Sequence, residues 1–213
     1  MPRRRGSQYV LLLIMLTAIE LILAFVPAIG FVDLSAVLPK SIFAVTTLHI
    51  PVVVGAVVLG GGAGAFLGLI YGLCHLVSAS FLVFDPIMSP LFTPFVSTGQ
   101  IAPSMLSLLI CIVPPILAGL VTALLVRVLG RMLHGVAITF MIAGGLGALV
   151  NWGLTLLGVM AVFGGPLSEA LGTGASAIAA SAACVNLPLE MLLGIIFAGG
   201  AGTGLYNKFI RPH

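Results

Sequence analysis

Long runs of apolar residues recur along this chain, and polar residues mainly mark the ends of those runs. Apolar runs of about 20 residues are long enough to cross the hydrocarbon core of a bilayer as helices. The pattern predicts six such helices, at about 9–29, 43–59, 63–80, 105–129, 136–163 and 177–206. We therefore expect an all-α, polytopic membrane protein, with six transmembrane helices in one bundle and a single domain over residues 1–213.

A proline interrupts the second predicted helix. Proline fits best in the first turn of a helix, so a helix that starts at Pro51 would extend only to Gly60. At about 1.5 Å per residue, that helix is too short to cross a bilayer. Residues 42–50 would then be irregular backbone, which the membrane interior tolerates only where it is buried in protein or lines a cavity. Interrupted segments of this kind point to transport sites.

Glycines recur at every fourth position after this segment, at 60, 64, 68 and 72. This spacing places them on one face of a helix, where the backbone of another helix can approach closely. The pattern predicts a packing surface, and Gly60, Gly64 and Gly68 are candidates for contact with a partner helix.

The composition excludes a water-soluble protein, because 61% of the residues are hydrophobic, 6% are charged and the mean hydropathy is +1.31. The three cysteines lie within apolar runs, which favours small core residues over disulfides or metal ligands. The first run, Tyr9–Ile29, follows three arginines as in a secretory signal, but it is longer than the apolar core of a signal peptide. We interpret it as a retained first helix.

Basic residues predict the orientation in the membrane. With the N-terminus inside, seven of the eight fall on the cytoplasmic side and only Lys40 falls outside. The positive-inside rule then places both termini in the cytoplasm and the chain in the cell membrane. The seven are Arg3, Arg4, Arg5, Arg127, Arg131, Lys208 and Arg211.

The predicted outer connections, 30–42, 81–104 and 164–176, are longer than the inner ones. The middle connection interleaves prolines with phenylalanines at positions 81, 84, 92 and 95. Such a segment either rests on the bundle or forms a lid over an external pocket, because long ordered loops are often functional.

Ionisable residues at membrane depth are costly, so each is a candidate for function. Glu20 lies midway along the first predicted helix, and Glu190 lies in the sixth, four residues after Asn186 and on the same helical face. These groups either bind a ligand or hydrogen-bond neighbouring helices. His49 precedes Pro51 at a predicted helix N-terminus, where free N–H groups favour a carboxylate, and a capping role is the alternative.

Other polar and aromatic side chains inside the predicted helices complete the candidate substrate-binding set. Asn151 and Trp152 offer an amide and a large ring, although Trp152 could equally face lipid. Tyr71 and His75 lie one turn apart near the outer end of the third helix, where a structural role is the alternative. The complete set is His49, Tyr71, His75, Asn151, Trp152, Asn186 and Glu190.

The sequence contains no motif for ATP binding or catalysis. It has no G-x-x-x-x-G-K-[ST] loop, no H-E-x-x-H and no Cys/His spacing typical of metal ligands. We therefore expect no enzyme activity, no metal and no cofactor.

The segment from Thr46 to Gly55, with the sequence TTLHIPVVVG, and the glycine-rich helix up to Gly72 resemble the S components of energy-coupling factor vitamin transporters. The pattern is most similar to the pantothenate-type members. Further similarity lies in Leu23–Pro27, Ser89–Phe92, Ile112–Gly119, Asn151 and Asn186–Glu190.

The resemblance implies a six-helix subunit that captures a water-soluble vitamin from the outside, with pantothenate as the first candidate. It implies a transmembrane coupling subunit and two cytoplasmic ATPase subunits as partners, and no nucleic acid. His49 would take an anionic or carbonyl group of the vitamin, Asn151, Asn186 and Glu190 would hydrogen-bond hydroxyl and amide groups, and Trp152 would supply apolar contact.

The family docks its coupling subunit through small residues on the first helix. Here the clear match is Ala24 with Ala28, which lies close to the outer end, whereas Thr17 and Ala18 lie nearer the cytoplasm without the full spacing. The ridge Gly60, Gly64 and Gly68 is an alternative surface.

Other functions remain open from the residues alone. A proton-coupled secondary transporter could use Glu20 or Glu190 as a relay, although six helices without a visible repeat are few for that design. A small intramembrane enzyme would need a nucleophile and a base, and a purely structural or interaction protein would need neither.

Overall fold

The computed structural model describes residues 3–32, 43–82, 87–97, 99 and 101–210. Within them, five helices are long and apolar enough to cross a membrane. These are α1 (Arg3–Phe25), α4 (Gly61–Phe81), α6 (Leu106–Leu129), α7 (Val136–Leu171) and α8 (Ala175–Phe197). The shorter elements are α2 (Pro27–Gly30), α3 (His49–Leu59), α5 (Ser89–Phe92), α9 (Thr203–Leu205), β1 (Phe31–Val32) and β2 (Val45–Thr46). The all-α class expected from the sequence is confirmed.

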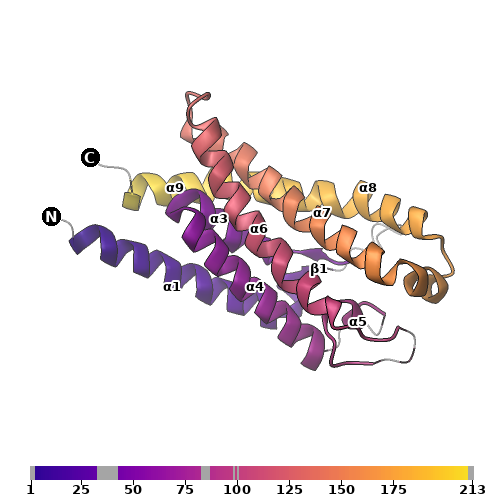
Figure 1. The fold of residues 1–213 in the computed structure, drawn as a ribbon. Helices are drawn as coiled ribbons and strands as arrows, with labels where there is room; N and C mark the ends of the chain where they lie inside the picture. The colour runs from indigo at the N-terminus through magenta and orange to yellow at the C-terminus, as the bar shows by residue number, and fades with distance from the viewer. Residues whose placement is uncertain (1–2, 33–42, 83–86, 98, 100, 211–213) are drawn as a thin grey trace.

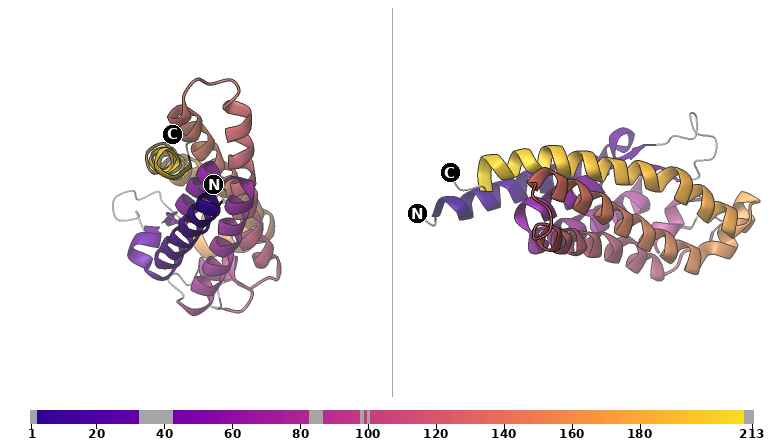
Figure 2. Two further views of the ribbon diagram at one scale, coloured as in Figure 1. Left: turned by 90° about the vertical axis from the view of Figure 1, so that its left-hand side faces the viewer. Right: turned by 90° about the horizontal axis from the view of Figure 1, so that it is seen from above.

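The long helices run side by side in one bundle (Figures 1 and 2). Both chain ends and the connection between α6 and α7 lie at one end, which we call the terminal end. Arg127, Arg131 and Lys208 are exposed there. The opposite end carries α5 and the connection between α7 and α8, and we call it the α5 end. Lys40, Phe84 and Arg211, which the sequence analysis places outside the helices, lie outside the described residues.

The predicted second helix, 43–59, consists of strand β2 followed by the 11-residue helix α3. Pro51 lies in the first turn of α3, which starts at His49. At about 1.5 Å per residue, α3 spans roughly half of the hydrocarbon core. Nine of its residues are buried, because α1, α4, α6, α7 and α8 surround it. The N-terminal end of α3 therefore lies inside the bundle.

The predicted glycine surface joins α4 to α6 within the chain. A Cβ atom at Gly64 would lie 2.8 Å from the carbonyl oxygen of Gly119, and one at Gly72 would lie 2.8 Å from that of Cys111. A Cβ atom at Gly68 would overlap the carbonyl of Pro115. The two backbones thus touch along this stripe, as close helix packing in membranes requires. Gly64 and Gly68 are buried here and do not offer a free surface to a partner, which corrects that expectation.

The predicted outer connection 164–176 is wrong over most of its length, because α7 continues to Leu171 and α8 begins at Ala175. Glycine and proline at 164–166 disfavour helix. However, Phe163 and Leu167 on either side of them are buried in one apolar cluster with Leu91 and Ile178. This packing outweighs the local preference against helix. At its other end the last helix runs on through two π-helical turns, Ala198–Gly202 and Tyr206–Ile210.

A short antiparallel strand pair precedes α3, with Phe31 opposite Thr46 and Val32 opposite Val45. Thr47 extends this contact, since its N–H donates to the carbonyl of Gly30 at 3.0 Å and its hydroxyl donates to that of Ile29 at 2.7 Å. The backbone expected to be irregular before Pro51 is thus fixed to the end of α2. This attachment positions Thr46 beside α8.

Candidate functional site

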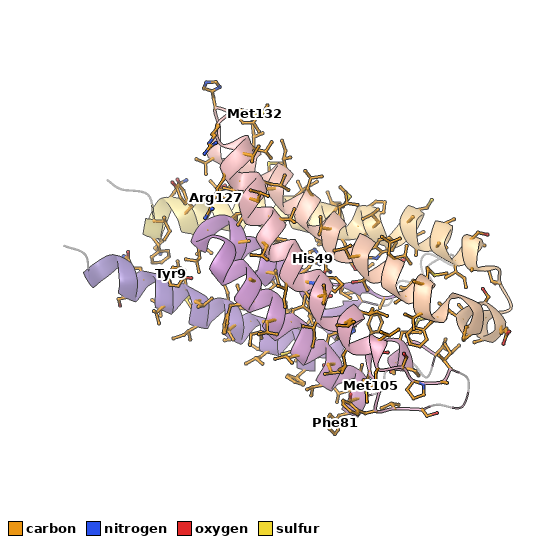
Figure 3. All side chains as sticks on the ribbon, in the orientation of Figure 1. Tyr9, His49, Phe81, Met105, Arg127 and Met132 are labelled. Atoms are coloured by element: carbon orange, nitrogen blue, oxygen red, sulfur yellow. The ribbon has the colours of Figure 1, made fainter. Side chains whose placement is uncertain are left out.

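Buried polar side chains from four helices meet near the N-terminal end of α3. They are His49 of α3, Tyr71 of α4, Asn151 of α7, and Asn186 and Glu190 of α8. Figure 3 shows His49 within the bundle, away from both ends. Polar groups in such a place need hydrogen-bond partners, because water does not reach them. We call these five residues and Thr46 the central polar cluster.

The Glu190 carboxylate is bound on one side by Thr46. Its Oε1 atom accepts hydrogen bonds from the Thr46 N–H at 3.0 Å and from the Thr46 hydroxyl at 3.1 Å. The other oxygen, Oε2, has no hydrogen-bond partner among the described residues. Strand β2 therefore orients the carboxylate through one of its two oxygens.

His49 lies against the same residue through two of its atoms. Its Nε2 atom is 3.0 Å from the backbone oxygen of Glu190. Its Nδ1 atom is 3.8 Å from Glu190 Oε2, which is longer than a hydrogen bond. Nδ1 is buried and has no hydrogen-bond partner among the described residues. These two polar atoms are therefore close to each other without forming a hydrogen bond.

Tyr71 connects the strand to α7. Its hydroxyl lies 3.5 Å from the Thr46 hydroxyl and also interacts with the side chain of Asn151. The Asn151 oxygen Oδ1 is buried without a hydrogen-bond partner in the described part of the chain. One acceptor on α7 is therefore available.

Asn186 occupies the helical face of α8 that also carries Glu190, as its spacing predicts. Its side-chain nitrogen donates to the carbonyl of Phe43 at 2.6 Å, and its oxygen Oδ1 has no partner among the residues described. Within the described part of the chain, four buried polar atoms of the central polar cluster therefore have no partner: His49 Nδ1, Asn151 Oδ1, Asn186 Oδ1 and Glu190 Oε2. Buried polar groups in native proteins are nearly always satisfied, so this concentration indicates a place for a polar ligand or for water.

His75 lies next to the central polar cluster in an aromatic group. Its ring centroid is 6.0 Å from that of Tyr71, 5.2 Å from that of Phe31 and 4.4 Å from that of Phe92. The structure thus places His75 beside Tyr71, one turn closer to the α5 end.

The segment between α4 and α6 folds back onto the bundle at the α5 end. Leu91 and Ile101 are fully buried in the apolar cluster of α7 and α8, and Ser107 of α6 donates to the carbonyl of Pro90 at 3.2 Å. Phe92 lies inward on His75, whereas Phe81 and Phe95 are exposed. One phenylalanine of the interleaved pattern therefore links this segment to the neighbourhood of Tyr71.

Two other candidates from the sequence are not members of the central polar cluster. Trp152 is partly buried on α7 next to Asn151. Glu20 of α1 is fully buried, and neither of its carboxyl oxygens has a hydrogen-bond partner among the described residues. Glu20 lies near Cys74 of α4 rather than near Glu190.

The candidate docking residues of α1 differ in exposure. Ala18 is exposed and Thr17 is partly buried, with its hydroxyl donating to Leu13 within the helix. Ala24 is fully buried, and its carbonyl accepts a hydrogen bond from Ser78 of α4. Ala24 thus packs against another helix of the same bundle, as Gly64 and Gly68 do. Gly60 lies between α3 and α4 and is half-buried.

A cavity of about 350 Å³ lies at the terminal end, away from the central polar cluster. Its lining includes Val57 of α3, Val126 of α6, Thr139 of α7 and Tyr206. None of the candidate substrate-binding residues lines it.

Three contributors to the site were missed in the sequence. Thr46 lies in the same short motif as His49, but threonine is common in apolar segments and carries no charge that would single it out. Phe31 and Phe92 have no helical spacing to Tyr71 or His75, so only the fold brings them together.

The described residues contain no group of three or more His, Cys, Asp or Glu side chains that could hold a metal ion. Hydrogen-bond donors and acceptors set in an apolar bundle are suited to bind a small polar molecule.

No family model matches the chain. Among curated proteins, the chain is 30% identical over 151 residues to "Pantothenic acid transporter PanT" of Lactococcus lactis subsp. cremoris (strain MG1363). The alignment covers 70% of this chain and 72% of that protein. This similarity agrees with the motif around His49 and with the apolar helices of the bundle. The chain therefore belongs to the pantothenate-type S components of energy-coupling factor transporters.

Proposed function

We propose that this protein is the substrate-capture subunit of an energy-coupling factor transporter and that it binds pantothenate. The observation that carries the proposal is the central polar cluster, in which four buried polar atoms lack partners among the described residues. The name of the relative supports the choice of vitamin.

The chemistry of pantothenate suits the cluster. The molecule carries two hydroxyl groups, an amide and a carboxylate on a short, partly apolar chain. The unpartnered oxygens of Asn151, Asn186 and Glu190 can accept hydrogen bonds from hydroxyl and amide groups. Trp152 and the rings around His75 would contact the apolar part of the ligand.

We propose that pantothenate enters from outside the cell at the α5 end. Described basic side chains are exposed at the terminal end, which favours a cytoplasmic location for both termini. The segment between α4 and α6 would then act as the lid, because Phe92 reaches His75 from that side.

Partner subunits would supply the energy for release into the cell, since the sequence contains no phosphate-binding loop. We propose a transmembrane coupling subunit and two cytoplasmic ATPase subunits. Ala18 and Thr17 remain candidates for contact with the coupling subunit, because α1 is largely exposed and packs on the bundle from one side.

The first test is thermal unfolding of the purified protein in detergent with pantothenate, biotin, folate, riboflavin or thiamine. A ligand at 100 times its dissociation constant adds about 2.7 kcal/mol to the free energy of unfolding. We expect pantothenate alone to raise Tm clearly. A folded, monodisperse protein whose Tm responds to none of the five vitamins would refute the proposal.

A further inference from the structure

The hydrogen bond between His49 and Glu190 fixes one proton. A backbone carbonyl oxygen can only accept, so Nε2 of His49 must carry the hydrogen that it shares with the Glu190 oxygen at 3.0 Å. In a neutral imidazole the second nitrogen, Nδ1, then carries a lone pair.

If Glu190 is ionised, this lone pair would lie close to a lone pair of its carboxylate oxygen Oε2. Nδ1 lies 3.8 Å from Glu190 Oε2, and both atoms are buried without a hydrogen-bond partner among the described residues. The backbone of Thr46 also interacts with the imidazole. A neutral histidine facing an ionised carboxylate would leave that charge buried without a cation, which is strongly unfavourable. The pair therefore holds one additional proton, either on Nδ1 or on Oε2, and its net charge is zero in both cases.

A neutral pair is poorly suited to a ligand carboxylate. The anion would add a net negative charge in a buried place next to Oε2. The described lysine and arginine side chains that could offset it, Arg127, Arg131 and Lys208, are exposed at the terminal end.

The same pair is well suited to a hydroxyl group. It presents one donor and one acceptor, and at a separation of 3.8 Å a single oxygen can lie at hydrogen-bond distance from both. A hydroxyl accepts one hydrogen bond and donates another, so it satisfies both atoms whichever of them holds the additional proton.

We infer that the His49–Glu190 pair binds a hydroxyl group of the ligand and that the ligand carboxylate lies elsewhere. This inference rests on the proposed function, and for pantothenate it assigns one of the two hydroxyls to the pair. It replaces the expectation that His49 receives the anionic group.

The test compares ligands and variants by isothermal titration calorimetry. The ligands are pantothenate, its alcohol panthenol, which lacks the carboxylate, and the two analogues that each lack one hydroxyl. The variants are Glu190→Gln, which keeps an acceptor for Thr46, and His49→Gln, which keeps a donor near the Glu190 carbonyl but removes Nδ1. Glu169→Gln, which removes a carboxylate from an exposed position on α7, is the matched control.

In the wild type and the control, we expect removal of one particular hydroxyl to raise Kd roughly 10- to 100-fold, the usual range for a hydrogen bond to a charged group. In Glu190→Gln and His49→Gln that penalty should fall to a few-fold. The ratio of Kd values for panthenol and pantothenate should stay the same in all four proteins, because the pair does not contact the carboxylate.

The opposite pattern would overturn the inference. If the panthenol-to-pantothenate ratio changes about tenfold in the two variants while the hydroxyl penalties stay constant, the pair binds the carboxylate. Constant ratios and constant penalties would show that the pair does not contact the ligand. If the wild type binds none of these ligands, the proposed function fails first, which is a distinct result.

Discussion

At the scale of single residues, Thr46 helps to arrange the central polar cluster. Its N–H and its hydroxyl both donate to Glu190 Oε1, and its hydroxyl also lies near Tyr71. It thereby connects the strand pair to α8 and α4. Without this contact, the Glu190 carboxylate would be less well oriented relative to His49.

Replacement of Thr46 by valine should therefore weaken ligand binding with little effect on folding. Valine keeps the shape and the backbone N–H but loses the hydroxyl bond, which costs about 1 kcal/mol of stability. Because the Glu190 carboxylate is then less well oriented, we expect Kd for the ligand to rise several-fold. The neighbouring Thr47→Val is the matched control, because the Thr47 hydroxyl donates to Ile29 and not to Glu190. Calorimetric titration of pantothenate into both variants checks this, and an equal loss in the two would contradict the specific role of Thr46.

Of the seven candidate substrate-binding residues selected from the sequence, five belong to the central polar cluster in the structure. They could be selected because polar side chains are conspicuous within apolar runs. Their location inside the bundle also follows from their positions within apolar runs. Their pairing does not, because the contact between His49 and Glu190 joins positions 141 residues apart. Thr46 was missed for the opposite reason, since an uncharged threonine costs little in an apolar segment.

At the scale of helices, the contact between α4 and α6 depends on the absence of side chains. The backbones touch along Gly64, Gly68 and Gly72, so the attraction comes from close van der Waals contact over a length of helix. The sequence predicted this spacing correctly but not its partner, because a stripe of small residues does not reveal which helix covers it.

Substitution of Gly68 by alanine should destabilise the bundle. The added methyl group would overlap the Pro115 backbone, which cannot move aside as a flexible side chain can. We expect a loss of about 1–3 kcal/mol, as for overpacking of other cores, seen as a lower Tm in detergent. The control is Gly62→Ala on the same helix, where the methyl group meets nothing within 4 Å and Tm should stay constant or rise. A normal Tm for Gly68→Ala would show that the two helices are free to separate.

Helix ends were less predictable than helix centres. The long apolar runs identified the five long helices, but glycine and proline at 164–166 suggested a loop where α7 continues. The tertiary contacts of Phe163 and Leu167 decide that case. The strand pair is also absent from the predictions, because a two-residue strand has no periodicity that a sequence can display.

At the scale of the whole molecule, the distribution of charge and the fold agree on two distinct ends. The chain ends and the exposed basic residues share the terminal end, and α5 lies at the other. We expect the terminal end to face the cytoplasm.

Labelling of single cysteines in intact cells tests this orientation. In a background with Cys184, which is exposed, replaced by alanine, a membrane-impermeant maleimide should label Phe95→Cys and should not label His134→Cys. Both positions are exposed, so the difference reports the side of the membrane. His134→Cys should react after the membrane is permeabilised. Labelling of His134→Cys alone in intact cells would reverse the proposed orientation and the proposed direction of capture.

The contact between α4 and α6 also limits how the protein can change shape. Rotation or sliding of either helix would drive a backbone carbonyl into the other, so the pair forms a rigid wall. Tyr71 and His75 belong to that wall, since they lie on α4 beside Gly72. We therefore expect the movement that admits a ligand to occur away from this wall, where strand β2 is held to α8 by the hydrogen bonds between Thr46 and Glu190.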